Sequence, residues 1–145
     1  MKKLCILYWE VVQKYQEPTS DEVLRAASSG QPLKRKLLPE MILVCNALRN
    51  DLIHLNKYVR GSMLRFLCKV KDEEILGPLI ASIIQCLEHR QHYVRKNAAL
   101  AIFHAHKFAG DVLIPDAPEL IEAFLMVETD SGARRNTFLM LFKSN

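Results

Sequence analysis

The stretch Asn56–Leu67, which reads Asn-Lys-Tyr-Val-Arg-Gly-Ser-Met-Leu-Arg-Phe-Leu, decides the fold because the chain repeats it. It returns at Gln91–Ile102 as Gln-His-Tyr-Val-Arg-Lys-Asn-Ala-Ala-Leu-Ala-Ile, and in weaker form at Asp130–Leu141. The arginines that mark the copies are 35 and then 39 residues apart: Arg60, Arg95 and Arg134. Such a period is typical of stacked helix pairs of the HEAT/armadillo type. The sequence therefore predicts an all-α solenoid.

Apolar residues within each copy recur with the period of one helix face. They are Val59, Met63, Phe66, Leu67 and Val70 in the first copy, and Val94, Ala98, Ala101, Ile102 and Ala105 in the second. Asn56 and Asp130 stand just before their helices, where a short polar side chain can accept a bond from a free N–H group, and Gln91 is less suited to this role. Each marker arginine either pairs with an acidic or carbonyl partner in the neighbouring repeat or remains solvated.

The composition is that of one ordinary soluble globular segment. The chain has 145 residues, of which 50% are hydrophobic and 25% charged, and it contains few glycines and prolines. Its net charge of +4 suits an acidic partner or a position near a membrane. Acidic and basic residues alternate along the chain, which argues against a nucleic-acid-binding protein.

The remaining helices are expected from periodicity and from turn residues. An opening helix is expected over Met1–Lys14, because the apolar run Leu4–Trp9 is too short for a signal peptide or a membrane span. Residues 16–39 form an irregular insertion that contains a short helix and the basic run Lys34-Arg35-Lys36. The helix pairs beyond it are expected at Glu40–Asp51 with Tyr58–Val70, Glu73–Glu88 with Tyr93–Lys107, and Pro118–Val127 with Ala133–Phe142. Residues 1–145 are thus expected to form a single solenoid segment of a longer array.

No residue pattern indicates catalysis, a cofactor or a small-molecule substrate. Cys86, His89 and His92 have a spacing that suits a zinc site, but the cysteine falls on an apolar helical position and the histidines in a turn. We therefore expect core and turn residues and no metal. The four cysteines lie in apolar runs, as in reduced intracellular proteins: Cys5, Cys45, Cys68 and Cys86.

Beyond the generic repeat, several stretches closely resemble the coatomer β-subunit family, whose trunk is adaptin-like. They are the opening Lys2–Val12, the run from Met41 to Leu52, Val59–Lys69, Cys86–Arg90, Tyr93–Ala98 and, most specifically, Leu113-Ile-Pro-Asp-Ala-Pro-Glu-Leu-Ile. The resemblance covers most of the chain and does not extend to residues 13–39.

The resemblance implies a non-catalytic scaffold and adaptor segment of the COPI vesicle coat. It implies assembly with other coatomer subunits, especially the δ subunit. It also implies recruitment to Golgi membranes by an Arf-type small GTPase in its GTP form, for Golgi-to-ER and intra-Golgi transport. The location implied is cytoplasmic, peripheral on Golgi and COPI vesicle membranes.

The same resemblance implies a GTPase-binding site on first helices of consecutive pairs. Ile42 and Cys45 match adaptor positions that contact the GTPase switch regions. Arg49, Leu79 and Ile83 are added because they lie nearby. The alternative is a HEAT-like solenoid that binds nucleic acid or excises bases, which requires a basic stripe along one face and strongly salt-dependent binding.

Overall fold

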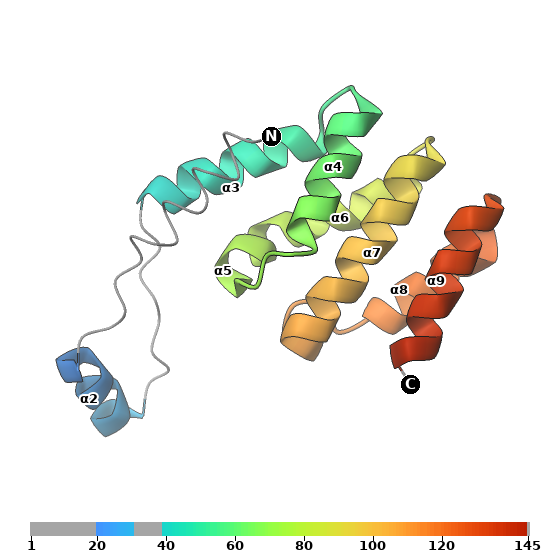
Figure 1. Ribbon diagram of the computed structural model, residues 1–145. Coiled ribbons are helices and arrows are strands. Elements are labelled where there is room, and N and C mark those ends of the chain that lie inside the picture. Colours follow the sequence, from blue (N-terminus) through green and yellow to red (C-terminus); the bar gives the residue numbers. More distant parts are fainter. Residues whose placement is uncertain (1–19, 31–38, 145) are drawn as a thin grey trace. The chain divides into compact units, whose positions relative to one another are not determined.

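The computed structural model describes residues 20–30 and 39–144, and all their regular structure is helical (Figure 1). The all-α solenoid predicted from the repeats is confirmed. The predicted opening helix over Met1–Lys14 and the basic run Lys34-Arg35-Lys36 lie outside the described residues. The chain divides into two compact units, Met1–Asn46 and Ala47–Asn145. None of the described helices is both long and apolar enough to cross a bilayer.

The first unit contains α2, Ser20–Ser29, and the first half of α3, Pro39–Leu52. Helix α2 lies within the predicted insertion, at the place where the sequence predicted a short helix. Gly30 follows it with a φ of 65°, a left-handed conformation that glycine adopts without strain and that commonly ends a helix. The helix predicted over Glu40–Asp51 corresponds to α3.

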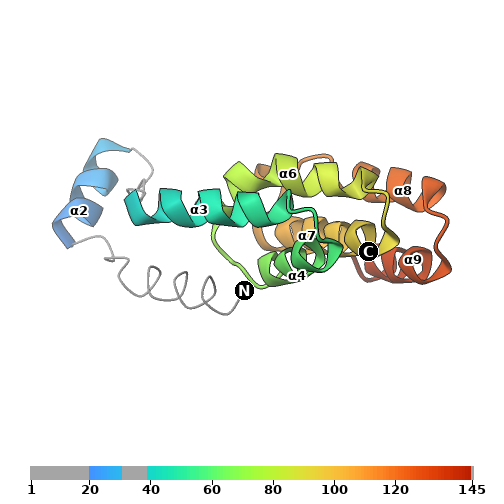
Figure 2. The ribbon, with the colours of Figure 1, turned by 90° about the horizontal axis from the view of Figure 1, so that it is seen from above.

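The second unit continues with helices that correspond to those predicted from the repeats. They are α4 Lys57–Leu67, α5 Glu73–Leu76, α6 Ile80–Gln85, α7 His92–Ala109, α8 Ala117–Val127 and α9 Ser131–Ser144. Short 3₁₀ turns connect or extend them at η1 Gly77–Leu79, η2 Cys86–Glu88 and η3 Gly110–Val112. Figure 2 shows that α4, α7 and α9 form one layer and that α6 and α8 form a second layer.

The helix predicted over Glu73–Glu88 is divided into α5, η1, α6 and η2. Its break lies at Pro78, which has no N–H group and cannot donate to the carbonyl group four residues earlier. The local turn tightens to the 3₁₀ form, and α6 begins directly after Leu79. The apolar residues of this run still share one side, and Ile75, Leu76, Leu79 and Ile83 are fully or almost fully buried.

Polar side chains cap the helices of the α4–α7–α9 layer at two of the three predicted positions. The Asn56 side chain accepts from the Tyr58 N–H at 2.9 Å, and Asp130 Oδ2 accepts from the Ala133 N–H at 2.8 Å. Gln91 makes no such bond. The predicted caps of α4 and α9 are therefore confirmed, as is the weaker suitability of glutamine.

The core of the second unit lies between the two layers and along the contacts of neighbouring second helices. Every residue of the apolar stripe predicted for the second copy is buried on α7, from Val94 to Ala105. In the first copy, Met63, Leu67 and Val70 are buried, whereas Val59 and Phe66 are partly exposed. Thr137 on α9 is also buried, and its hydroxyl donates to the Ala133 carbonyl at 2.9 Å.

Helices α4 and α7 approach closely at a single glycine. Gly61 is buried, and a Cβ atom at this position would collide with the Tyr93 ring. The ring of Tyr93 also lies 5.6 Å from that of Tyr58, centroid to centroid. Gly61 is thus required by the space that the tyrosine of the next repeat fills, and not by its backbone conformation.

We expect Gly61→Ala to lower the free energy of unfolding by about 1–2 kcal/mol, because the added methyl group overpacks the contact with Tyr93. Chemical denaturation followed by circular dichroism measures this change. In a Tyr93→Ala background the same substitution should instead be neutral or stabilise by up to about 1 kcal/mol, because alanine favours helix more than glycine does. Ser62→Ala, one position along, serves as the control. Equal effects of Gly61→Ala in both backgrounds would contradict the packing explanation.

Candidate protein-binding site and the polar network between repeats

The two residues matched to GTPase-contacting positions differ in exposure. Ile42 on α3 is 51% exposed. Cys45, three residues later, is only 5% exposed. In this conformation Ile42 offers a side chain to a partner and Cys45 does not.

Arg49 lies in the second unit and is exposed. Its Nη2 donates to the carbonyl oxygen of Pro78 at 3.1 Å, which joins the end of α3 to η1. Leu79 and Ile83 follow in the same run as Pro78, but both are completely buried. The structure thus brings Arg49 next to the start of the following first helix and places the two apolar residues in its core.

Periodicity alone contained the signal that Leu79 and Ile83 are core residues. They continue the spacing of Ile75 and precede Cys86, giving apolar residues at i, i+4, i+8 and i+11 on one side of the helical run. The residues of α6 that face solvent are Ala81 and Gln85. A partner that approaches this helix from solvent therefore meets those two side chains first.

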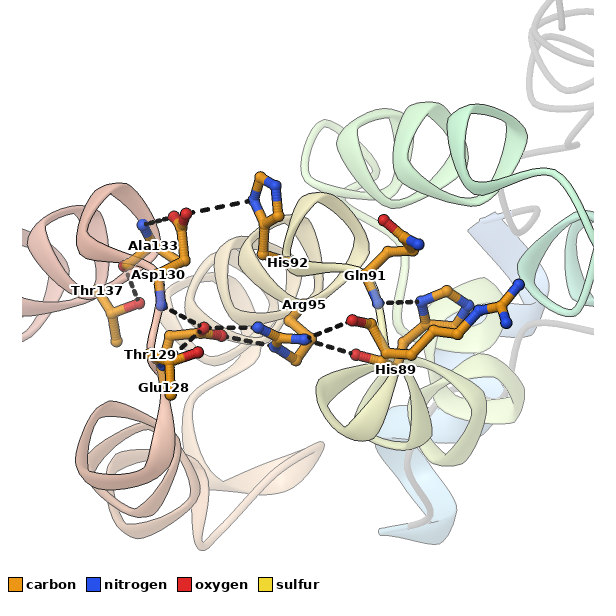
Figure 3. A network of polar contacts seen from close by, with 10 residues as sticks. His89, Gln91, His92, Arg95, Glu128, Thr129, Asp130, Ala133 and Thr137 are labelled. Carbon is orange, nitrogen blue, oxygen red and sulfur yellow. Dashed lines mark hydrogen bonds and ion pairs between the residues drawn. The ribbon is translucent and has the colours of Figure 1, made fainter.

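The strongest polar contact in the described residues joins α7 to the turn between α8 and α9 (Figure 3). Arg95 Nε and Nη2 donate to the two carboxylate oxygens of Glu128, each at 2.6 Å. The Glu128 side chain is fully buried and that of Arg95 is 19% exposed. The planar guanidinium matches the carboxylate in two parallel bonds, which is the strong form of such a pair.

Arg95 also binds the turn that precedes its own helix. Its Nη1 donates to the carbonyl oxygens of His89 at 2.9 Å and of Arg90 at 3.0 Å. One guanidinium therefore holds together the turns of two successive repeats. The predicted pairing of the marker arginine with an acidic residue of the neighbouring repeat is confirmed for Arg95.

The marker arginine has different partners in the three copies of the repeat. Arg60 donates to the carbonyl oxygens of His54 at 2.5 Å and Ile53 at 2.8 Å, both in the turn before its own helix. Arg134, in the third copy, is exposed. Only Arg95 therefore shows the predicted acidic partner, and the solvated alternative describes Arg134.

The residue six positions before each marker arginine has a shared structural role, which the sequence analysis missed. In the first two copies it is a histidine whose Nδ1 accepts the backbone N–H two residues later: His54 from Asn56 at 3.0 Å, and His89 from Gln91 at 3.1 Å. In the third copy it is Glu128, whose Oε1 accepts the N–H groups of Thr129 and Asp130 at 2.9 Å. Aligning the copies by their arginines would have revealed this position.

The surroundings of Glu128 and His89 lower the pKa of both side chains, for different reasons. The hydrogen bonds from Arg95 lower the pKa of Glu128 to about 2, against the effect of burial. Burial lowers the pKa of His89, and the nearby Arg60 guanidinium lowers it further. Arg60 thus faces a neutral histidine at the position where Arg95 faces a carboxylate.

The cysteines of the second unit are protonated packing residues. Burial raises the pKa of Cys68 to about 11, and its thiol donates to the Leu64 carbonyl at 3.2 Å. Burial also raises the pKa of Cys86. Nucleophilic catalysis and metal binding both use the thiolate, so these two thiols are in the unreactive form at neutral pH. Within the part of the chain that the structure describes, no cluster of three or more His, Cys, Asp and Glu residues is arranged to hold a metal.

A shallow pocket lies beside the Arg95–Glu128 pair. Its wall combines the end of the α6–η2 run with the α8–α9 turn, through Leu87, Glu88, His89, Arg90, Arg95, Phe124, Val127, Glu128 and Thr129. Among its polar groups, Arg95 is bonded to Glu128 and to the carbonyl oxygens of His89 and Arg90. The pocket thus lies at a joint between two successive repeats.

The repeats, their stacked second helices and the arginine-bound turns correspond to a known family. Residues 1–143 match the model of the adaptin N-terminal region. The chain belongs to the adaptin N-terminal family.

Curated proteins similar to this adaptin N-terminal chain come from distant eukaryotes. The chain is 48% identical over 145 residues to "Coatomer subunit beta" of Drosophila melanogaster, covering 100% of the chain and 13% of that relative. It is 49% identical over 142 residues to "Coatomer subunit beta" of Dictyostelium discoideum, covering 98% of the chain and 14% of the relative. It is 48% identical over 143 residues to "Coatomer subunit beta-1" of Arabidopsis thaliana, with coverages of 98% and 13%. The chain thus spans about one seventh of the length of these relatives.

We expect Glu128→Gln to lower the free energy of unfolding by about 2–4 kcal/mol near neutral pH, because the Arg95 guanidinium loses its buried countercharge. The pKa of Glu128 rises from about 2 in the folded chain to about 4.5 on unfolding, so the wild type loses this stabilisation as pH falls from 4.5 towards 2. Urea denaturation across that range measures both effects, and the variant should lack this part of the pH dependence. Glu122→Gln, at an exposed position of α8, should change the free energy by less than about 0.5 kcal/mol. Identical acid profiles for the wild type and Glu128→Gln would contradict the assignment.

We expect His89→Glu to raise the free energy of unfolding by about 1 kcal/mol, because it places a carboxylate beside Arg60 as Glu128 stands beside Arg95. His89→Gln keeps an acceptor for the Gln91 N–H without the charge and should show no such gain. The gain should disappear in an Arg60→Gln background and shrink in high salt. Thermal and urea denaturation measure it. Stabilisation that persists without Arg60 would show that the contact between the repeats is not its source.

Proposed function

We propose that the chain is a scaffold segment of the β subunit of the COPI vesicle coat. The observation that carries the proposal is the similarity of 46–49% identity, over nearly all of the chain, to coatomer β subunits from animals, plants, fungi and an amoeba. The stacked helix pairs fit this role, because a solenoid presents long faces to partners while each repeat is held by its neighbours. The role is structural, and no step of it requires catalysis by this chain.

The partners that follow from this role are other coatomer subunits, with the δ subunit foremost among them. The location that follows is the cytoplasmic side of Golgi membranes and COPI vesicles, where the coat serves Golgi-to-ER and intra-Golgi transport. An Arf-type GTPase in its GTP form recruits the coat, and this segment contributes to that recruitment.

Within this proposal, Ile42 is the residue that contacts the GTPase directly. Its side chain is about half exposed, and an apolar residue in solvent contact is available to pack against an apolar partner surface. Cys45, almost fully buried beneath it, supports the helix that presents Ile42.

The other residues that the proposal names lie in the second unit and are described there by themselves. Arg49 is exposed and offers the unused donors of its guanidinium to a partner, while its Nη2 is held by the Pro78 carbonyl. Leu79 and Ile83 are buried in the core, and their packing fixes the position of the helical run that contains them.

The proposal predicts that Ile42→Asp abolishes binding of the GTP-loaded Arf protein, lowering affinity at least about a hundredfold, because a charge replaces an apolar contact at the interface. Leu43→Asp is the matched control, since Leu43 is the adjacent apolar residue and is 67% exposed. Both variants should retain the helical circular dichroism of the wild type. Calorimetric titration with GTP- and GDP-loaded Arf measures the difference.

Unchanged affinity of Ile42→Asp would remove the site assignment and leave the scaffold role standing. Equal binding of the GTP and GDP forms by the wild type would remove the recruitment role itself. Cys45→Asp is avoided, because a charge at a buried position destabilises the helix and would lower binding without reporting on the contact.

A further inference from the structure

The second helices of the repeats carry only one sign of charge. Helices α4, α7 and α9 contain no aspartate or glutamate. They contain nine lysines and arginines: Lys57, Arg60, Arg65, Arg95, Lys96, Lys107, Arg134, Arg135 and Lys143.

The two first-helix runs that lie entirely within the same unit carry the opposite sign. The runs α5–η2 and α8 contain no lysine or arginine. They contain five glutamates: Glu73, Glu74, Glu88, Glu119 and Glu122. Because α4, α7 and α9 form one layer and α6 and α8 the other, charges that alternate along the sequence are separated in space (Figure 2). The charges that are mixed along the sequence are thus sorted by helix within this unit.

Several basic side chains of the α4–α7–α9 layer are available to a partner. Arg65 and Lys69 are exposed and follow one another at a spacing of four residues, on one side of α4 and its C-terminal end. Lys107 and Arg135 are exposed on α7 and α9, and Lys96 is half-buried. Arg95 differs, since Glu128 neutralises it.

Side chains that suit an interface between water and a less polar phase lie among these charges. Tyr58 is 61% exposed and Leu139 is 44% exposed. Lys57 lies 5.2 Å from the centroid of the Tyr58 ring, and Lys96 lies 5.4 Å from that of Tyr93. Tyrosine rings and long lysine stems place apolar groups deep and polar groups at the boundary, as membrane interfaces require.

The geometry favours an anionic bilayer over other polyanions. Single-stranded nucleic acid stacks its bases on open aromatic faces, whereas Tyr58 and Tyr93 contact one another with a lysine near each ring. Phe138 and Phe142 are exposed on α9, where apolar rings also suit insertion among lipid headgroups. An acidic peptide needs a groove that supplies free positive charge, and in the pocket beside Arg95 that guanidinium is already neutralised by Glu128. A bilayer needs only a broad basic surface, and each lysine or arginine near it strengthens binding about fivefold.

We propose that the exposed basic side of the α4–α7–α9 layer binds anionic phospholipid bilayers directly. This contact adds a lipid to the partners of the proposed coat segment, and it does not pass through Ile42. Vesicles free of any GTPase therefore test it separately from the recruitment proposal.

The experiment measures partitioning of the full chain onto phosphatidylcholine vesicles with and without 30% phosphatidylserine, by sedimentation. One variant combines Arg65→Gln, Lys69→Gln, Lys96→Gln and Lys107→Gln, which lowers the net charge from +4 to 0. The matched variant reaches the same net charge on the other layer, through Ala81→Glu, Gln85→Glu, Ala123→Glu and Met126→Glu, all at exposed positions. Circular dichroism confirms that both variants fold as the wild type does.

The wild type and the matched variant should bind phosphatidylserine vesicles, whereas the first variant should bind about a hundredfold more weakly or worse. Binding of the wild type should fall as salt rises. Equal loss in both variants would overturn the proposal, because net charge alone would explain it. Absence of binding by the wild type, or tighter binding of single-stranded poly(U) RNA than of the vesicles, would overturn it as well.

Discussion

The fold of the second unit depends on one constraint: a helix pair with an apolar side on each of its two faces must be covered by another pair. The constraint is met twice, by two different contacts. Between α4 and α7, the absence of a side chain at Gly61 lets the Tyr93 ring lie against the helix backbone. Between α7 and α9, the backbones are joined at their turns by the buried pair of Arg95 and Glu128. The first contact uses packing and the second uses charge, although both lie near the beginning of a second helix.

This difference has an energetic consequence. A packed contact between a glycine and an aromatic ring depends little on salt or on acid pH, since no ion pair takes part in it. An unpaired charge is costly to bury, so losing either partner of a buried ion pair destabilises the fold. Glu128 also accepts two backbone N–H groups, which ties the α8–α9 turn to the same carboxylate. The junction between the last two pairs is therefore the one at which acid loosens the array.

Most of the fold could be predicted from the sequence, because the chain contains three copies of the repeat. The apolar stripe of α7 is buried as its period predicts, and Asn56 and Asp130 cap their helices. The partners of the arginines could not be predicted, since they depend on which residue of another turn lies opposite. Likewise, the position of Leu79 and Ile83 in the core follows from how α6 is rotated against its neighbours, and adjacency in sequence does not determine that rotation. The separation of charge between layers was hidden because residues from alternate helices are interleaved along the chain.

That separation explains why one segment suits two kinds of surface. The contact proposed for Ile42 belongs to α3, a first helix, whereas the basic side chains belong to second helices. In a solenoid of helix pairs, all second helices share one layer, so a bias in their composition accumulates over successive repeats into a continuous face. A single repeat with two or three surface lysines would bind an anionic surface weakly, and each further repeat multiplies that affinity. The array thus converts a small preference in each repeat into a property of the whole face, and the acidic first helices keep the opposite layer from competing for the same ligand.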